Sequence, residues 1–264
     1  MKKKLRHVIV RSRNVSCRPL RDIVTDKRII FRMGSTTPTS RITKRTDYIE
    51  INSPEACRIS GDKILMKKAF EDNNIPTAEY VAFEPDCSTE IIKNTVKMCL
   101  EEWKRMIIKH RYSSKGNGIF FIDSQDTLDE WLQDHRLTNY VYERYYTYSK
   151  EYRIHVTDDG CFYACRKMLK NDATDRWHRH DSNSVWILED NEMFNKPSNW
   201  DAIVQSCIDA KNAVGLDVCA IDVKVQTKEE NPQYIILETN SAPSLGSVGI
   251  ERYKKLFIDS FNNQ

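Results

Sequence analysis

Long apolar runs are missing from this sequence of 264 residues, whose uninterrupted hydrophobic stretches are only a few residues long. A helix that crosses a membrane needs about 20 predominantly apolar residues. The basic start, MKKKLRHVIVRSR, also lacks the longer apolar core of a secretory signal. Hydrophobic residues make up 40% of the chain, which is enough for a sizeable core, and charged residues make up 30%. These features predict a soluble cytoplasmic protein with no membrane span.

Paired cysteine motifs are absent as well, although the chain has eight cysteines. No CxxC pair occurs, and several cysteines occupy apolar positions of helix or strand patterns. This favours buried thiols in a reducing compartment over a disulfide framework. We also expect no zinc site, because the histidine cluster of His178 and His180, with Asp181 nearby, is not accompanied by cysteines of matching spacing.

The chain also lacks a strong net charge, because 41 basic and 38 acidic side chains leave a formal net charge of only +3. The chain as a whole therefore lacks the basic field of a dedicated nucleic-acid binder. The basic excess is local: within residues 1–45, Lys and Arg are opposed only by Asp22 and Asp26. An acidic substrate or partner could dock on this segment. A solvated basic surface is the alternative.

Apolar periodicity divides the chain into short strands and amphipathic helices, without repeats or low-complexity segments. Residues 1–52 form a small basic unit with short strands. Beyond it, Ser60 and Ser88 are expected to cap helices, and further helices are expected over 125–135, 200–214 and 250–261. Antiparallel strands with helices on one side predict an α+β fold with two lobes, about 53–142 and 143–258, and a ligand between them.

The stretch AIDVKVQTKEENPQYIILETNSAPSL, residues 220–245, predicts a β-hairpin with a polar turn. If the turn is centred near Glu230, Asp222 lies opposite Glu238 and the two side chains share a face. Asn240 lies on the same face by the period of two. Opposed carboxylates with an amide oxygen suit a hard cation such as magnesium. The alternative is a solvated hairpin with two surface acids.

A second motif, IIKHRYSSKGNGI, places Lys109 near the end of a buried strand and then a glycine-containing turn over residues 113–118. Such turns let backbone amides approach phosphate closely, although a structural hairpin turn would look the same. Lys63 lies in the first turn of a helix. Glu151 and Arg153 are two residues apart on one strand, where they form either a surface ion pair or partners for ribose and phosphate.

In chain order, GDK, IIKHRYSSKGNGI, YVYERYYTYSKEYRIHV, AIDVKV and ILETNSAPSL resemble the successive elements of the ATP-grasp superfamily, over about residues 53–258. The pattern is most similar to the ribosomal-protein glutamate ligases. D-alanine:D-alanine ligases carry an Arg two residues before the first metal-binding acid, where this chain has Ala220. The resemblance implies an ATP-grasp fold of two α+β lobes enclosing the nucleotide, preceded by a small, truncated amino-terminal α/β unit.

The resemblance also implies roles for the matched residues. Residues 113–118 would form a flexible flap, and the loop 171–184, with Asn183 near its end, would contact the acceptor. Arg166 or Lys167 would replace the arginine missing at Ala220. The implied ATP-binding residues are Lys63, Lys109, Ser113, Ser114, Lys115, Gly116, Gly118, Tyr142, Glu143, Tyr145 and Glu151. The implied catalytic residues are Arg153, Arg166 and Lys167, and the implied magnesium ligands are Asp222, Glu238 and Asn240.

The chemistry implied by this family is ATP- and magnesium-dependent ligation, in which a carboxylate becomes an acylphosphate that an amine then opens. Small carboxylates and amines, of amino-acid or peptide type, would be the substrates, and a homodimer is one option for the assembly. A kinase on the same scaffold, acting on a small anionic alcohol, is the first alternative. The second is a non-catalytic nucleotide- or nucleic-acid-binding module, for which the basic first 45 residues are the support.

Overall fold

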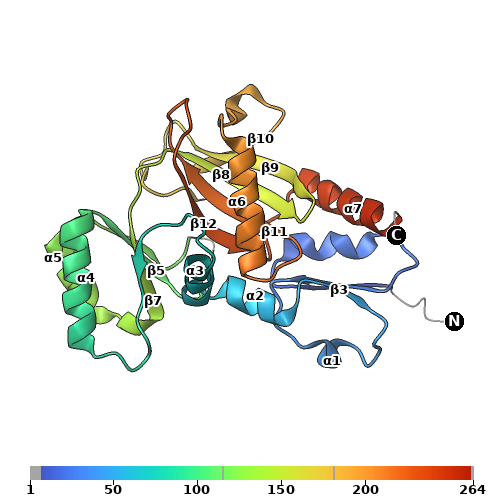
Figure 1. The fold of residues 1–264 in the computed structure, drawn as a ribbon, viewed down its shortest axis with the longest axis horizontal. Helices are drawn as coiled ribbons and strands as arrows, with labels where there is room; N and C mark the ends of the chain where they lie inside the picture. Colours follow the sequence, from blue (N-terminus) through green and yellow to red (C-terminus); the bar gives the residue numbers. More distant parts are fainter. Residues whose placement is uncertain (1–6, 115, 181, 263–264) are drawn as a thin grey trace.

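The computed structural model describes residues 7–114, 116–180 and 182–262, and the strands in this part of the chain form three sheets. Figure 1 shows their arrangement: the four-stranded sheet and its helices lie at one end, the amino-terminal unit and the last helix lie at the other, and the five-stranded sheet lies between and above them. Within these described ranges, no helix combines the length and the apolar character that a bilayer crossing requires.

The amino-terminal sheet is parallel, in the order β1 (Val8–Ser12), β2 (Ile29–Met33) and β3 (Ile49–Ile51). The 3-10 helix η1 (Val15–Asp22) connects β1 to β2, and the short helix α1 (Thr39–Ile42) precedes β3. Strand β2 is buried throughout, against η1 and the last helix, α7 (Ser247–Asn262). The unit therefore shares its apolar core with the carboxyl-terminal end of the chain.

The four-stranded antiparallel sheet has the order β4 (Tyr80–Val81), β7 (Tyr140–Arg144), β5 (Met106–His110) and β6 (Ile119–Ile122). A 3-10 turn, η2 (Leu137–Asn139), leads into β7. Helices α4 (Thr89–Trp103) and α5 (Gln125–Asp134) contribute their predicted apolar faces to its core. Ser88 caps α4 as predicted, because its side chain accepts a hydrogen bond from the Ile91 backbone N–H.

The five-stranded antiparallel sheet has the order β10 (Ser184–Leu188), β9 (Gly160–Leu169), β8 (Lys150–Thr157), β11 (Cys219–Val225) and β12 (Tyr234–Asn240). One face packs against α6 (Trp200–Ala213), and η3 (Glu192–Phe194) follows β10. As predicted, α6 is followed by Gly215, whose φ of 74° lies in the left-handed region that glycine tolerates. The opposite face carries most of the charged strand residues.

The helical segment after residue 53 differs from the prediction. It consists of two helices, α2 (Pro54–Gly61) and α3 (Lys63–Asp72), and Ser60 lies inside the first instead of capping the second. Asp62 is the cap of α3, because its extended backbone breaks the helix and its Oδ1 accepts from the Ile64 and Leu65 N–H groups. The buried Ser60 hydroxyl instead donates to the Thr239 carbonyl. The break places Lys63 in the first turn of α3.

Candidate active site between the two sheets

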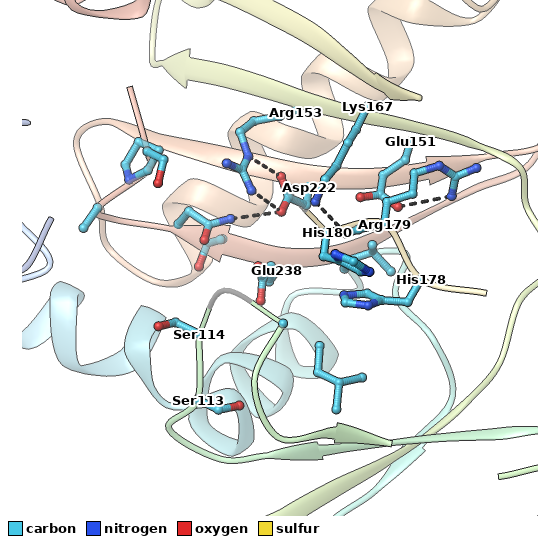
Figure 2. Close-up of a pocket in the computed structure, with 18 of the residues that line it drawn as sticks. Ser113, Ser114, Glu151, Arg153, Lys167, His178, Arg179, His180, Asp222 and Glu238 are labelled. Atoms are coloured by element: carbon cyan, nitrogen blue, oxygen red, sulfur yellow. Dashed lines mark hydrogen bonds and ion pairs between the residues drawn. The ribbon is translucent and has the colours of Figure 1, made fainter. Parts of the chain in front are cut away.

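A single large cavity, of about 1240 Å³, lies between the five-stranded and the four-stranded sheets. Its upper wall consists of the charged faces of β8, β9, β11 and β12, and its lower wall consists of α3, β5, β7 and the turn 113–118 (Figure 2). The loop 171–183 closes one side. The other side contains Arg13, Asn14 and Gly34 of the amino-terminal unit and the segment 241–249. Of the Lys and Arg residues described between positions 7 and 45, Arg13 is the one that lines this cavity.

The hairpin of β11 and β12 has the predicted register, with Asp222 paired to Glu238. A β-bulge follows, because Val223 pairs with Ile236 and Leu237 is the extra residue. Asn240 shares the face of Asp222, as predicted, and its Nδ2 lies 3.3 Å from Asp222 Oδ2. The bulge leaves Leu237 beside Glu238 in the cavity lining, so an apolar side chain adjoins the acidic group.

Asp222 is buried and forms a two-pronged ion pair with Arg153, with N···O distances of 2.7 and 2.8 Å. Burial by itself raises the pKa of this carboxyl, but the Arg153 guanidinium outweighs burial and lowers it. The Glu238 carboxylate makes no hydrogen bond or ion pair with any other described residue. The two acids therefore share one face, but among the described residues only Asp222 forms an ion pair at contact distance, while Glu238 acts on Lys63 from farther away.

On the lower wall, Lys109 Nζ lies 2.8 Å from Glu143 Oε2, and the fully buried Lys67 lies 3.5 Å from the same oxygen. Burial lowers the pKa of Lys67 to about 8. Lys63 donates to the Ser113 carbonyl at 2.5 Å. Sequence analysis missed Lys67, although its spacing of four residues from Lys63 on α3 places both on one helical face. Lys67 and Lys109 thus share the Glu143 carboxylate, and Lys63 bonds to a backbone carbonyl beside them.

In the described part of the turn 113–118, Ser113, Ser114 and Gly116 line the cavity. Lys115 lies outside the described residues. Gly116 has a φ of 78°, and a Cβ there would lie 2.9 Å from His178 Cε1. Gly118 is a correction, because it does not line the cavity: a Cβ there would meet His110 Cβ at 2.9 Å, and its carbonyl accepts from the His110 N–H within the hairpin.

Two predicted nucleotide contacts near the end of β7, Tyr142 and Tyr145, have side chains that face opposite ways. Tyr145 lines the cavity, where its ring lies 4.9 Å from Lys224 Nζ and 5.1 Å from the Phe121 ring. Tyr142 is a correction, because its fully buried side chain faces the opposite way, into the core under α4 and α5. Its hydroxyl donates to the Leu137 carbonyl. The alternation of strand side chains causes this difference.

On β9, the same alternation places the side chains of Arg166 and Lys167 on opposite faces of the sheet. Lys167 lines the cavity and donates to the Arg179 carbonyl at 2.6 Å. Arg166 is a correction, because it pairs in register with Tyr152 on the core side of the sheet and donates to the Met193 carbonyl. Lys167 is therefore the basic residue of this pair that reaches the site.

Glu151 and Arg153 both line the cavity from one face of β8, as predicted. Burial raises the pKa of Glu151, although Arg179 lies 3.4 Å from its Oε2. The Arg153 guanidinium also lies 4.8 Å from the centre of the Trp186 ring, on β10. Sequence analysis missed this aromatic contact, because strand alternation does not specify that β9 lies between β8 and β10 or which of their residues meet across it.

The loop 171–183 contributes Asp175, Trp177, His178, Arg179, His180 and Ser182 to the cavity lining. The expectation that Asn183 contacts the acceptor is corrected, because Asn183 does not line this cavity. Its Nδ2 donates to the carbonyls of Asp175 and His178, and its Oδ1 accepts from the His180 N–H, so the buried amide holds the loop backbone. Burial lowers the pKa of His178 to about 4.

No protein-family model matches the chain, and no curated protein matches its sequence. Solved structures do match its fold. D-alanyl-alanine synthetase A from Vibrio cholerae aligns over 82% of this chain and 68% of its own, with 13% identity and a TM-score of 0.60. The ATP-grasp ligase PsnB, complexed with a minimal precursor, aligns over 82% and 64%, with 17% identity and a TM-score of 0.56.

N5-carboxyaminoimidazole synthetase from Staphylococcus aureus, complexed with ADP, aligns over 84% of this chain and 56% of its own, with 15% identity and a TM-score of 0.60. The chain thus spans between about half and two thirds of the length of these structures. At such low identity the likeness concerns the fold. The chain has the ATP-grasp fold, as its motifs predict.

Proposed function

We propose that this protein is an ATP- and Mg²⁺-dependent ligase that joins a carboxylate to an amine. The carboxylate oxygen attacks the γ-phosphorus of ATP, which releases ADP and forms an acylphosphate. The amine nitrogen then attacks the acyl carbon, and inorganic phosphate leaves as the amide bond forms. Phosphoryl transfer of this kind depends mainly on positioning and charge, so it requires no Ser, Cys or His nucleophile.

The observation that carries the proposal is that basic side chains on one wall of the cavity face acidic and amide side chains on the other wall. Lys63 and Lys109 face it from below, and Asp222, Glu238 and Asn240 face it from above. Lysines near phosphate and a carboxylate set near magnesium are the parts that transfer of a γ-phosphoryl group needs. Because the two patterns come from opposite walls, a bound nucleotide would lie between the sheets.

The donor set on the upper wall fits magnesium, since it consists of hard carboxylate and amide oxygens. Glu238 makes no hydrogen bond or close ion pair with the described residues, so it can accept a cation without breaking such a contact. Bound magnesium would neutralise charge on the transferred phosphoryl oxygens. The lower wall fits an anion, because both Lys63 and Lys109 line it with the single carboxylate of Glu143, and the buried Lys67 contributes a further positive charge to Glu143 from behind the wall.

We assign positioning of the acylphosphate to Arg153 and Lys167, which both reach the cavity from the sheet. Tyr145 and Glu151 would contact the nucleoside end, and the turn 113–118 would cover the phosphates. The substrate class that we favour is an amino acid or a peptide. Two structural neighbours support this choice: one is a D-alanyl-alanine synthetase and the other is a ligase complexed with a peptide-like minimal precursor.

The test is ADP release in the presence of MgCl₂ and ATP, with pooled amino acids and small carboxylates as substrates. Wild-type protein should release ADP only with a particular carboxylate and amine. Glu238→Ala should lose at least about 100-fold in rate, because it removes a group that stabilises transition-state charge. Glu230→Ala, an exposed acid in the turn of the same hairpin, is the matched control and should retain full activity.

Other outcomes separate the alternatives. A stable phosphorylated product that forms without an amine would identify a kinase. Absence of ADP release, combined with equal nucleotide affinity of wild type and Glu238→Ala, would contradict the magnesium assignment and support a binding module.

A further inference from the structure

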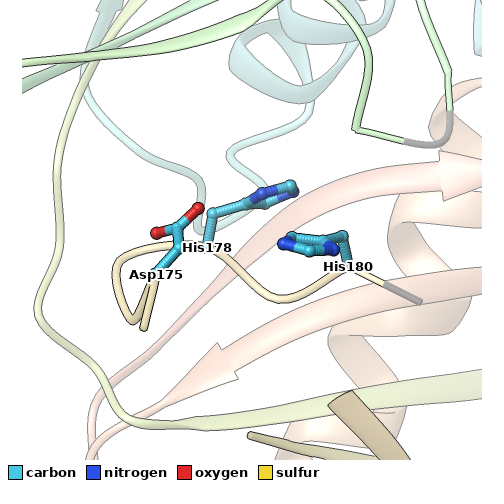
Figure 3. A group of neighbouring side chains, drawn as sticks. All are labelled: Asp175, His178 and His180. Carbon is cyan, nitrogen blue, oxygen red and sulfur yellow. The ribbon is translucent and has the colours of Figure 1, made fainter. Parts of the chain in front are cut away.

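Three metal-ligating side chains meet in the loop between β9 and β10, beside the proposed nucleotide site. One ligand atom each of Asp175, His178 and His180 lies within 4.8 Å of the others. Figure 3 shows the two imidazole rings facing each other, with the Asp175 carboxylate beside His178. The ring centres of the two histidines are 5.3 Å apart. The loop sequence places all three within six residues, although Asp175 was not part of the histidine cluster noted in the sequence.

Two features of these side chains indicate a missing ligand. The Asp175 Oδ1 atom is buried and has no hydrogen-bond partner among the described residues, and an unsatisfied buried carboxylate oxygen is costly. His180 Nδ1 lies 2.6 Å from the Ser182 hydroxyl. When Nδ1–H donates to that oxygen, the lone pair of Nε2 remains free, which is the usual way in which an outer partner orients a metal-binding histidine.

The loop backbone is held in place before any ion binds. One buried side chain, Asn183, donates to the carbonyls of Asp175 and His178, at 3.0 and 2.9 Å, and accepts from the His180 N–H at 2.9 Å. The backbone of all three residues is therefore held by one amide. A loop fixed in this way loses little further conformational entropy when its side chains converge on an ion.

We propose that Asp175, His178 and His180 bind a divalent transition-metal ion of the Zn²⁺ class. Two imidazoles and one carboxylate suit such ions, whereas Mg²⁺ prefers an all-oxygen set. All three residues line the cavity, so the remaining coordination position faces the space between the sheets. The ion would also hold His178 against the turn at Gly116. This site is separate from Asp222 and Glu238 and does not depend on the proposed ligase activity.

The experiment is titration of the full-length protein with Co²⁺ alone, without nucleotide or Mg²⁺, followed by visible absorption, with Zn²⁺ competition measured by calorimetry. One equivalent of Co²⁺ should bind and be displaced by Zn²⁺. Loss of an outer partner typically costs about 10–100-fold in metal affinity. Ser182→Ala should weaken binding by about that factor, and His178→Ala and His180→Ala should weaken it at least as much.

Matched controls exclude other sites. Asp172→Ala removes an exposed acid from the same loop, and His7→Ala removes an exposed histidine elsewhere. Both should bind Co²⁺ like wild type, as should Glu238→Ala, which tests the ligase proposal independently. If His178→Ala fails to fold by circular dichroism, Asp175→Asn provides the second test. Undiminished one-equivalent binding in these loop variants, or a thiolate-to-cobalt charge-transfer band, would overturn the proposal.

Discussion

The two walls of the cavity neutralise their charges in different ways. On the lower wall, Lys67 and Lys109 share the one buried carboxylate of Glu143, and Lys63 bonds only to a backbone carbonyl. On the upper wall, Asp222 is paired with Arg153, while Glu238 has no cationic partner within hydrogen-bonding distance among the described residues. The lower wall thus has a lysine, Lys63, without a carboxylate at contact distance, whereas the upper wall has a carboxylate, Glu238, without a cation at contact distance. This difference suits an anion below and a cation above.

The two walls also differ in how many close partners each buried carboxylate has. Glu143 keeps one lysine at ion-pair distance if it loses the other, but Asp222 keeps only the Asn240 amide at contact distance if it loses Arg153, with Lys167 acting from farther away. Removing one partner of a buried ion pair is costly mainly because it leaves the other charge uncompensated. The two walls should therefore respond unequally to the loss of one cation.

The largest expected effect is that of Arg153→Ala, on the upper wall. It leaves the buried Asp222 carboxylate without its ion-pair partner and should lower the free energy of unfolding by about 3–5 kcal/mol. Urea denaturation measures this change. The double variant Arg153→Ala/Asp222→Asn is the control, and it should recover part of the loss. A loss below about 1 kcal/mol would show that the pair is effectively solvent-screened.

Asn183→Ala should have the next largest effect. It removes an amide that makes three hydrogen bonds to the loop backbone and leaves buried backbone groups unsatisfied. We expect a loss of about 1–3 kcal/mol in the free energy of unfolding. Limited proteolysis should then cut the loop 171–183 faster than in wild type. Unchanged proteolysis would mean that other contacts hold the loop.

Gly116→Ala tests the contact between the flap and this loop. The positive φ at residue 116 costs a residue with a Cβ about 1–2 kcal/mol, and the added Cβ would lie 2.9 Å from His178 Cε1. The turn should move away from the loop and exchange its amide hydrogens faster, which hydrogen-exchange mass spectrometry can detect. Gly246→Ala, where an added Cβ meets no atom within 4 Å, is the control and should leave exchange in the turn unchanged.

The smallest expected effect is that of Lys67→Met, on the lower wall. Glu143 keeps Lys109, and the unbranched apolar side chain fits the buried path of the lysine, so stability near pH 7 should change by less than about 1.5 kcal/mol. A loss as large as that of Arg153→Ala would remove the difference between the walls.

The pH dependence of this variant gives an independent check. Burial lowers the pKa of Lys67 from its usual value of 10.5 to about 8 in the folded protein. The unfolded chain therefore binds more protons between these values, and this lysine makes wild-type stability increase as pH rises from 8 to 10.5. Lys67→Met should lose that contribution. Urea denaturation at pH 8, 9 and 10 compares the two slopes, and equal slopes would contradict the assignment.

Sequence patterns predicted the local part of the molecule. The register of Asp222 with Glu238 follows from two short strands and one turn, and the buried faces of α4 and α5 follow from helical periodicity. Strand periodicity also predicted that Glu151 and Arg153 share a face. It did not specify which face is covered, and for that reason Arg166 and Tyr142 were assigned to the site, although Tyr142 lies in the protein core and Arg166 is on the face of its sheet away from the cavity.

By itself, then, the sequence determined the order of the elements, the acidic hairpin and the ATP-grasp pattern, because these depend on neighbours that are close in the chain. Only the tertiary structure decided which distant charges meet. Lys67 and Glu143 are paired across two elements, Asp222 is paired with Arg153 across neighbouring strands, and Asp175 joins the histidines through a loop held by Asn183. Such contacts depend on how sheets and loops pack, and residue spacing does not encode that packing.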